Sequence, residues 1–140
     1  CIFEDTNLSE GRGTTKPFEM IGAPWLNSEA VIERMGRQDG VILRECSFTP
    51  TFSDYKDSFC HGIQLHVTDR EAFEPFAVGI RLLDAIRRTH SEFEIDPSIT
   101  KLIGSDEILK EAFDAESFIK REQQKVEEWQ KLSQKWQIYI

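Results

Sequence analysis

A polar segment near the start of the chain holds the densest set of groups that could act on a ligand. Residues 4–15 read EDTNLSEGRGTT and bring two glutamates, an amide, several hydroxyls and an arginine into one loop. Gly11 and Gly13 are expected to make this loop mobile and to let its backbone approach a ligand closely. Carboxyl groups serve as general acids or bases, and the other groups suit a polyhydroxylated ligand. The candidate residues are Glu4, Glu10, Asn7, Ser9 and Arg12.

The same segment also has a purely structural interpretation, and the sequence leaves both open. Asp5, Asn7 and Ser9 are residue types that satisfy backbone groups in turns, and Arg12 could simply pair with Glu10. A phosphate-binding loop is excluded, because the Gly-Arg-Gly run lacks the further glycine and the Gly-Lys-Ser/Thr ending of that motif.

A second candidate site lies at the end of a predicted strand. Residues 63–68 read IQLHVT, and this alternation predicts one apolar face and one polar face that carries Gln64 and His66. Asp69 and Arg70 follow at the strand end, where a rigid element commonly presents side chains to a cleft. These four residues are further candidates for binding, although a histidine on a polar strand face also has a structural interpretation.

A set of aromatic residues is the third feature with a possible role in binding. Aromatic rings stack on sugar rings, but they also fill the core of a domain, and the sequence does not choose between these roles. The residues are Phe18, Trp25, Phe48, Phe52 and Tyr55.

The cysteines favour neither a metal site nor nucleophilic catalysis. Cys1, Cys46 and Cys60 are odd in number and have no paired spacing, so we expect buried free thiols and no disulfide framework. Cys60 and His61 are neighbours, but two adjacent residues cannot supply a four-ligand site. No Gly-x-Ser-x-Gly elbow is present. We therefore predict no metal site.

Length and composition predict one globular domain. The chain has 140 residues, of which 39% are hydrophobic and 11% aromatic, which is ample material for one core. Its 17 basic and 25 acidic residues give a net charge of −8, which disfavours nucleic acids and anionic lipid surfaces as partners. No apolar run approaches the roughly eighteen residues that a membrane helix needs. We expect no nucleic-acid partner and no membrane span.

The elements that must position these groups are short and of both kinds. We predict a short strand at Ile2-Phe3, a polar loop over 7–17 and a helix over 28–38 with Ser28 as its N-cap. The run VILREC at 41–46 predicts a strand, and the next strand follows at 63–68.

The second half of the chain is predicted to be mainly helical. A helix should run from Pro75 to about Arg88 and bury Phe76, Ile80, Leu83 and Ile86. The region 96–113 should form two short helical pieces that break at Gly104. From 116 to 136 apolar residues recur at helical spacing, which predicts a long amphipathic helix against the core. The end, 137–140, is either a closing strand or an extended tail.

These predictions together give an α+β fold. We expect a single domain in which a small mixed or antiparallel sheet is packed by about three to five helices. The chain begins without Met and inside an apolar pair, so we expect it to continue a longer polypeptide that carries any targeting signal.

Two long segments resemble a known bacterial family. They are residues 3–25, FEDTNLSEGRGTTKPFEMIGAPW, and residues 48–73, FTPTFSDYKDSFCHGIQLHVTDREAF. They contain, in one order, the run Glu-x-Thr-Asn-x-Ser-x-Gly-Arg-Gly-Thr, the segment Gly-Ala-Pro-Trp and the strand end Gln-x-His-Val-Thr-Asp. Weaker features are Leu102-Ile103-Gly104 and a last helix with Trp129. The chain resembles, over essentially its whole length, the C-terminal domain of the NamZ-type exo-β-N-acetylmuramidases.

The resemblance implies the C-terminal half of a two-domain cell-wall glycosidase. A Rossmann-like N-terminal domain, absent from this chain, would face residues 1–140 across the active-site cleft. The implied reaction releases N-acetylmuramic acid from the non-reducing ends of peptidoglycan fragments, in the periplasm or outside the cell, with no metal or nucleotide cofactor. The chain alone would then be inactive. The alternative is a non-catalytic cell-wall glycan-binding or structural domain.

The resemblance also implies roles for the candidate residues. Glycosidases commonly use two carboxyl groups, and one of them would come from the missing domain. Among the residues present, the family pattern fixes Glu4 more firmly than Glu10, so Glu4 is our first choice. Its neighbours Asn7 and Ser9 would face the sugar.

The remaining roles concern the anionic group of the sugar and its hydroxyls. Either Arg12 or Arg70 would attract the lactyl carboxylate, and His66 would position a hydroxyl or a neighbouring carboxylate. Two places depart from the family pattern. Asp5 stands where a small residue is usual, and the ending over 137–140 differs from the more usual finish.

Overall fold

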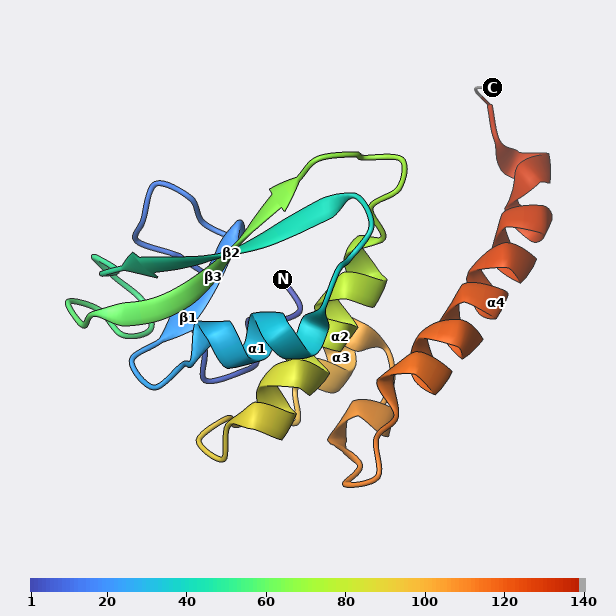
Figure 1. Ribbon diagram of the computed structural model, residues 1–140. Helices are drawn as coiled ribbons and strands as arrows, with labels where there is room; N and C mark the ends of the chain where they lie inside the picture. Colours follow the sequence, from blue (N-terminus) through green and yellow to red (C-terminus); the bar gives the residue numbers. More distant parts are fainter. Residues whose placement is uncertain (139–140) are drawn as a thin grey trace.

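The computed structural model describes residues 1–138 and shows an α+β domain (Figure 1), which confirms the predicted fold class. Three antiparallel strands form the sheet in the order β1-β3-β2. The strands are β1 Met20–Ala23, β2 Val41–Phe48 and β3 Cys60–Val67. The α-helices are α1 Ser28–Met35, α2 Pro75–Thr89, α3 Ile99–Ile103 and α4 Ala115–Ser133, and the 3₁₀ helices are η1 Glu107–Leu109 and η2 Gln134–Trp136.

The strand β3 forms at the predicted place, but the predicted packed face is only partly buried, since Leu65 is half-buried and Val67 is 46% exposed. Ile63 lies opposite Ile21 of β1 and is fully buried, while Gln64 lies opposite Met20 of β1 and Arg44 of β2. Directly paired residues point to the same face of a sheet. Gln64 therefore shares one face of the sheet with Met20 of β1 and Arg44 of β2.

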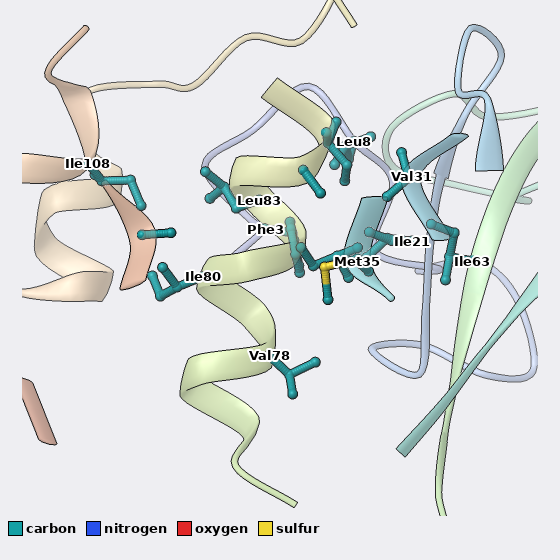
Figure 2. Close-up of a cluster of buried hydrophobic side chains, with 14 of the residues drawn as sticks. Phe3, Leu8, Ile21, Val31, Met35, Ile63, Val78, Ile80, Leu83 and Ile108 are labelled. Atoms are coloured by element: carbon teal, nitrogen blue, oxygen red, sulfur yellow. The ribbon is translucent and has the colours of Figure 1, made fainter. Parts of the chain in front are cut away.

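The core sits on both sides of α2. This helix starts at Pro75, as predicted, and most of its side chains from Ala77 to Ile86 are buried. In Figure 2 the labelled side chains Leu8, Ile21, Val31 and Ile63 lie on the sheet side of α2, whereas Ile108 lies on the other side. The helix thus holds the sheet layer and the C-terminal segments together.

Two local predictions were wrong in detail. Residues Ile2 and Phe3 form a turn instead of a strand, because Phe3 is buried in the core and Ile2 packs beside Gly79 of α2. The N-cap of α1 is Asn27, whose side chain accepts a hydrogen bond from the amide of Ala30. Ser28, predicted as the cap, instead donates its hydroxyl to the carbonyl of Gly62 at 2.8 Å.

The last helix differs most from expectation. The break at Gly104 is confirmed, since α3 ends there with a left-handed backbone and η1 follows. The long helix also forms, but only its first turns are buried, through Ala115, Phe118 and Ile119. Phe76 is also more exposed than predicted. Figure 1 shows α4 extending away from the sheet and from α2.

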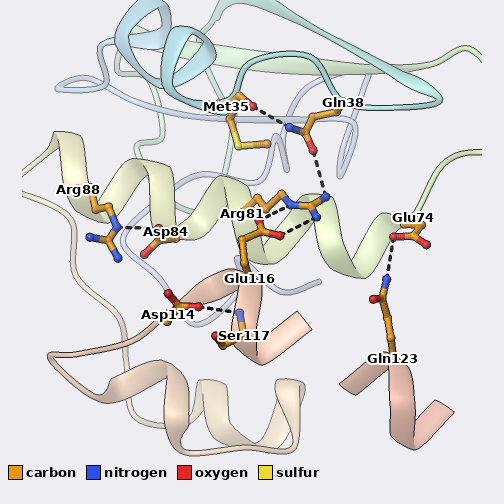
Figure 3. A network of polar contacts seen from close by, with 10 residues as sticks. All are labelled: Met35, Gln38, Glu74, Arg81, Asp84, Arg88, Asp114, Glu116, Ser117 and Gln123. Carbon is orange, nitrogen blue, oxygen red and sulfur yellow. Dashed lines mark hydrogen bonds and ion pairs between the residues drawn. The ribbon is translucent and has the colours of Figure 1, made fainter. Parts of the chain in front are cut away.

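A polar network fixes the angle at which α4 leaves the body (Figure 3). Arg81 of α2 binds both carboxylate oxygens of Glu116 on α4, at 2.6 and 3.0 Å, and also contacts Gln38 after α1. The hydrogen bond from Arg81 lowers the pKa of the Glu116 carboxyl. Further along, Gln123 of α4 donates to Glu74 at 3.0 Å.

Residues 1–138 contain neither a membrane-spanning helix nor a cluster of metal-binding side chains. No helix within residues 1–138 is long and apolar enough to cross a membrane. In the same range, no three His, Cys, Asp or Glu side chains gather closely enough to hold a metal ion. The predicted closing strand or tail at 137–140 falls partly outside the described residues.

Candidate functional site

Arg12 joins the two glutamates that the sequence selects. Its Nη2 lies 2.7 Å from Glu4 Oε2 and its Nε lies 2.7 Å from Glu10 Oε1. The two carboxylates differ in access, because 30% of the Glu4 side chain is exposed and only 5% of the Glu10 side chain. The guanidinium also stacks near the ring of Phe18, at 5.3 Å from its centroid. Glu4 is therefore partly exposed to solvent, and its ion pair with Arg12 holds its carboxylate in place.

Gly11 and Gly13 give this loop its shape. Both have left-handed backbone angles, with φ of 78°. A side chain at Gly13 would meet the backbone of Thr51 and Phe52 at 2.7 Å, so the loop lies directly against the segment before β3. Thr51 completes this contact by donating its amide and its hydroxyl to the carbonyl of Gly13.

The side chains of Asn7 and Ser9 form hydrogen bonds with backbone groups of the protein. The amide of Asn7 donates to the carbonyl of Glu92 at 2.7 Å and accepts from the backbone of Glu94 at 2.9 Å. Ser9 is buried, pairs through its backbone with Gly22 of β1, and its hydroxyl accepts from the amide of Gly11. For these two residues, and for the pairing of Arg12 with Glu10, the geometry matches the structural interpretation of the loop.

A hydrogen-bonded relay connects this loop to the aromatic residues. Trp25 donates its indole N–H to the hydroxyl of Tyr55 at 3.1 Å, and Tyr55 donates to the carbonyl of Asn7 at 2.8 Å. Trp25 also packs on His90, with ring centroids 5.4 Å apart. Trp25, Tyr55 and half-buried Phe48 are thus part of the framework, while Phe18 and Phe52 are exposed.

The backbone around Tyr55 is strained. Within residues 1–138, every non-glycine residue with a positive φ lies in one of two loops. Phe18 lies in the loop that also carries Arg12, and Ser53, Tyr55 and Asp57 lie in the loop before β3; their φ values are between 56° and 66°. Such backbone conformations cost energy and persist where surrounding contacts enforce them. They are concentrated here at the loops that carry the candidate site.

Glu4 lines a surface pocket of about 480 Å³. The pocket lies between the first residues of the chain, the loop that contains Asp54, and the segment 94–98. Its lining is strongly acidic, with Glu4, Asp5, Asp54, Glu94 and Asp96. Asp54 was not selected from the sequence, and only its place within the family-like segment 48–73 pointed to this loop.

The second group of candidates divides between two places. Gln64 and His66 lie on the polar face of β3; Gln64 contacts Arg44 at 3.5 Å, and the Nε2 of His66 is buried without a hydrogen-bond partner among the described residues. Three strand residues, about 10 Å, separate Gln64 from the end of β3, and Asp69 and Arg70 lie beyond it. No direct hydrogen bond or ion pair within residues 1–138 connects them to Glu4 or Arg12.

Asp69 and Arg70 differ from each other in their contacts. The carboxylate of Asp69 accepts from the amides of Glu71 and Ala72, at 2.9 and 3.3 Å, and so closes the turn after β3. Arg70 is exposed at the surface of this turn. Asp69 therefore serves the local turn, whereas the Arg70 side chain is accessible to solvent.

Comparisons with known proteins identify the family of this chain. The family model described as the C-terminal part of the exo-β-N-acetylmuramidase NamZ matches residues 1–139. The chain belongs to this family. It is 38% identical over 146 aligned residues to the peptidoglycan β-N-acetylmuramidase NamZ of Bacillus subtilis strain 168, a match that covers 99% of this chain and 35% of that protein.

A solved structure shares the fold. The crystal structure of a DUF1343 family protein from Bacteroides fragilis superposes with a TM-score of 0.76 at 24% sequence identity. The match covers 96% of this chain and 38% of that one. The chain thus spans a little more than a third of the length of the proteins it matches.

Proposed function

We propose that this chain is the C-terminal domain of a cell-wall glycosidase that releases N-acetylmuramic acid from the non-reducing ends of peptidoglycan fragments. The family match over residues 1–139 and the identity to the Bacillus subtilis enzyme support this assignment. In the proposal a Rossmann-like N-terminal domain precedes residue 1 and forms the opposite wall of the active site. The enzyme then works where its substrate is, in the periplasm or outside the cell.

The observation that carries the proposal within this chain is the unequal access of the two carboxylates on Arg12. Glu4 is partly exposed and lines the pocket, whereas Glu10 is almost fully buried. We therefore propose that Glu4 contacts the sugar and that Glu10 positions Arg12. A carboxylate that is already oriented by a charged hydrogen bond needs no reorganisation when substrate arrives.

Arg12 has a second task in the proposal. It uses Nη2 and Nε for the two glutamates, and its Nη1 makes no hydrogen bond within residues 1–138. The lactyl group of N-acetylmuramic acid carries a carboxylate, and a guanidinium binds such a group well. Exposed Phe18 lies beside Arg12 and offers an apolar surface to the sugar ring.

Glycoside hydrolysis with two carboxyl groups would be completed from the other domain. One carboxyl protonates the leaving oxygen while the other acts on water or on the anomeric carbon. Because Glu10 is buried, we propose that the second group lies on the preceding domain. Gln64, His66, Asp69 and Arg70 then form a separate contact zone along β3, and Asn7 and Ser9 shape the loop.

The experiment compares two proteins on a chromogenic muramide. The longer polypeptide should release N-acetylmuramic acid, and the 140-residue chain should not. Turnover by the chain alone at the rate of the longer polypeptide would contradict a site shared between domains. Absence of turnover by the longer polypeptide, with the muramide and with natural peptidoglycan fragments, would contradict the activity itself.

A glycan-binding module is the second candidate, and one observation favours it. Phe18 and Phe52 are exposed on the two adjoining loops, where stacking on sugar rings needs no chemistry. This function predicts that the longer polypeptide binds muramyl saccharides without turnover. It also predicts that Glu4→Gln leaves the affinity almost unchanged, while Phe18→Ala weakens it.

A further inference from the structure

The last helix continues past the edge of the domain. Ala115, Phe118 and Ile119 of α4 are buried in the core, but no residue of α4 beyond Ile119 is buried. Figure 1 shows the helix extending far away from α2, on which its first turns pack. The outer half of α4 therefore does not pack against the domain core.

The outer half of α4 and the short η2 after it nevertheless keep an apolar face, which we call the α4 stripe: Val126, Trp129 and Leu132 of α4 and Trp136 of η2. These side chains are between 49% and 60% exposed. Phe118 and Trp129 are eleven residues apart, about three helical turns, so the stripe prolongs the side of α4 that is buried at its start. Trp129 and Trp136 face each other, with ring centroids 6.3 Å apart.

A groove joins the stripe to the body of the domain. It has a volume of about 430 Å³ and lies where α4 leaves α2. Its apolar lining includes Phe76 at the start of α2, Ile103, Ile119 and Val126. Phe76 is itself exposed, although the periodicity of α2 placed it on the buried side. Stripe and groove thus form one continuous apolar surface.

Polar contacts orient α4 just before this surface. The bidentate contact of Arg81 with Glu116 and the hydrogen bond of Gln123 with Glu74 tie α4 to α2 on either side of the point where it leaves the core (Figure 3). The stripe is therefore presented to a partner without a large conformational search, which lowers the cost of binding.

The exposed area of the α4 stripe distinguishes between two possible partners, a second copy of the chain and another domain of the same polypeptide. From the exposed fractions, each tryptophan offers about 150 Å² and the stripe in total on the order of 450 Å², a size typical of an interaction surface. A stable dimer buries about 800 Å² on each partner, which the stripe does not supply. Two domains of one chain associate with smaller interfaces, because the connection between them raises their effective concentration.

The relatives supply such a domain. This chain spans 35% of the Bacillus subtilis protein and 38% of the Bacteroides fragilis chain, and its family is described as the C-terminal part of NamZ. We propose that the α4 stripe and its groove dock an apolar surface of the preceding domain of the same polypeptide. This rests on the domain organisation in the proposed function, and not on the chemistry of the site.

Hydrogen exchange tests the proposal. The backbone amides of residues 126–136 should exchange at least about tenfold more slowly in the longer polypeptide than in the 140-residue chain. Trp129→Asp in the longer polypeptide should abolish this protection. The matched control is Gln124→Asp, which adds the same charge on the opposite, exposed side of α4.

Two results would overturn the proposal. One is equal exchange of residues 126–136 in both proteins. The other is protection in the 140-residue chain that rises with protein concentration, together with a dimer in sedimentation, which would make a second copy the occupant. A longer polypeptide that protects the stripe but does not cleave muramides would refute the proposed activity and leave the docking intact.

Discussion

Replacing Arg12 by alanine should reveal how strongly the Glu4 loop depends on a single guanidinium. The change leaves the buried carboxylate of Glu10 without its partner. Breaking a buried ion pair costs about 3–5 kcal/mol, and an exposed pair contributes about 0.2–1 kcal/mol. Because Glu10 is buried and the Arg12 side chain is 37% exposed, we expect an intermediate loss of about 2 kcal/mol.

Urea unfolding of the 140-residue chain measures this loss. With a typical dependence on urea, the midpoint should fall by about 1 M. Glu10→Gln introduced beside Arg12→Ala should recover about 1 kcal/mol, because a neutral amide is cheaper to bury alone than a carboxylate. The control is Lys16→Ala, which removes an exposed ion pair with Glu19 and should cost less than about 0.5 kcal/mol. An Arg12→Ala midpoint equal to that of the control would refute the reasoning.

Three further outcomes test other parts of the structure. Gly62→Ala should cost about 3 kcal/mol in urea unfolding, because the new methyl group would lie 2.5 Å from a carbonyl oxygen of β1, whereas Gly79→Ala on α2 meets only ordinary contacts and should not destabilise. Tyr55→Phe removes both hydrogen bonds of the relay and should cost about 2 kcal/mol; a cost below about 0.5 kcal/mol would mean that the relay does not hold the loop. Burial raises the pKa of the Cys60 thiol, so at pH 8 a thiol reagent should label exposed Cys1 first and Cys60 only slowly, and equal rates would contradict its burial.

Local signals explain what the sequence predicts well. The alternation around Gln64, the proline at the start of α2 and the glycine that ends α3 each act within a few residues, and all three elements form as predicted. β1 was missed because it has only four residues, one of them glycine, and its side chains are all buried, so no alternation marks it. The opening pair Ile2-Phe3 looked like a strand because apolar residues in a row do not reveal whether they pair or simply pack.

Non-local contacts explain what the sequence does not predict. The bonds from Asn7 reach segments more than eighty residues away, and no spacing within the loop foretells them. The participation of Asp54 and Tyr55 likewise depends on how the loop before β3 folds onto the first residues. Periodicity also identifies the apolar face of α4 correctly, but it cannot tell which molecule or domain covers that face.

The most direct measurement for the proposed function is the turnover of a chromogenic muramide by the longer polypeptide with Glu4→Gln, compared with Glu19→Gln as control. Glu19 is an exposed carboxylate in the same stretch of chain and pairs only with Lys16 among the described residues. If Glu4 faces the sugar, its substitution should lower kcat/KM by at least about a hundredfold, in line with the loss of a group that acts in the transition state. The control should keep the wild-type rate. Wild-type turnover by the Glu4→Gln enzyme would contradict the assignment of this pocket to the active site.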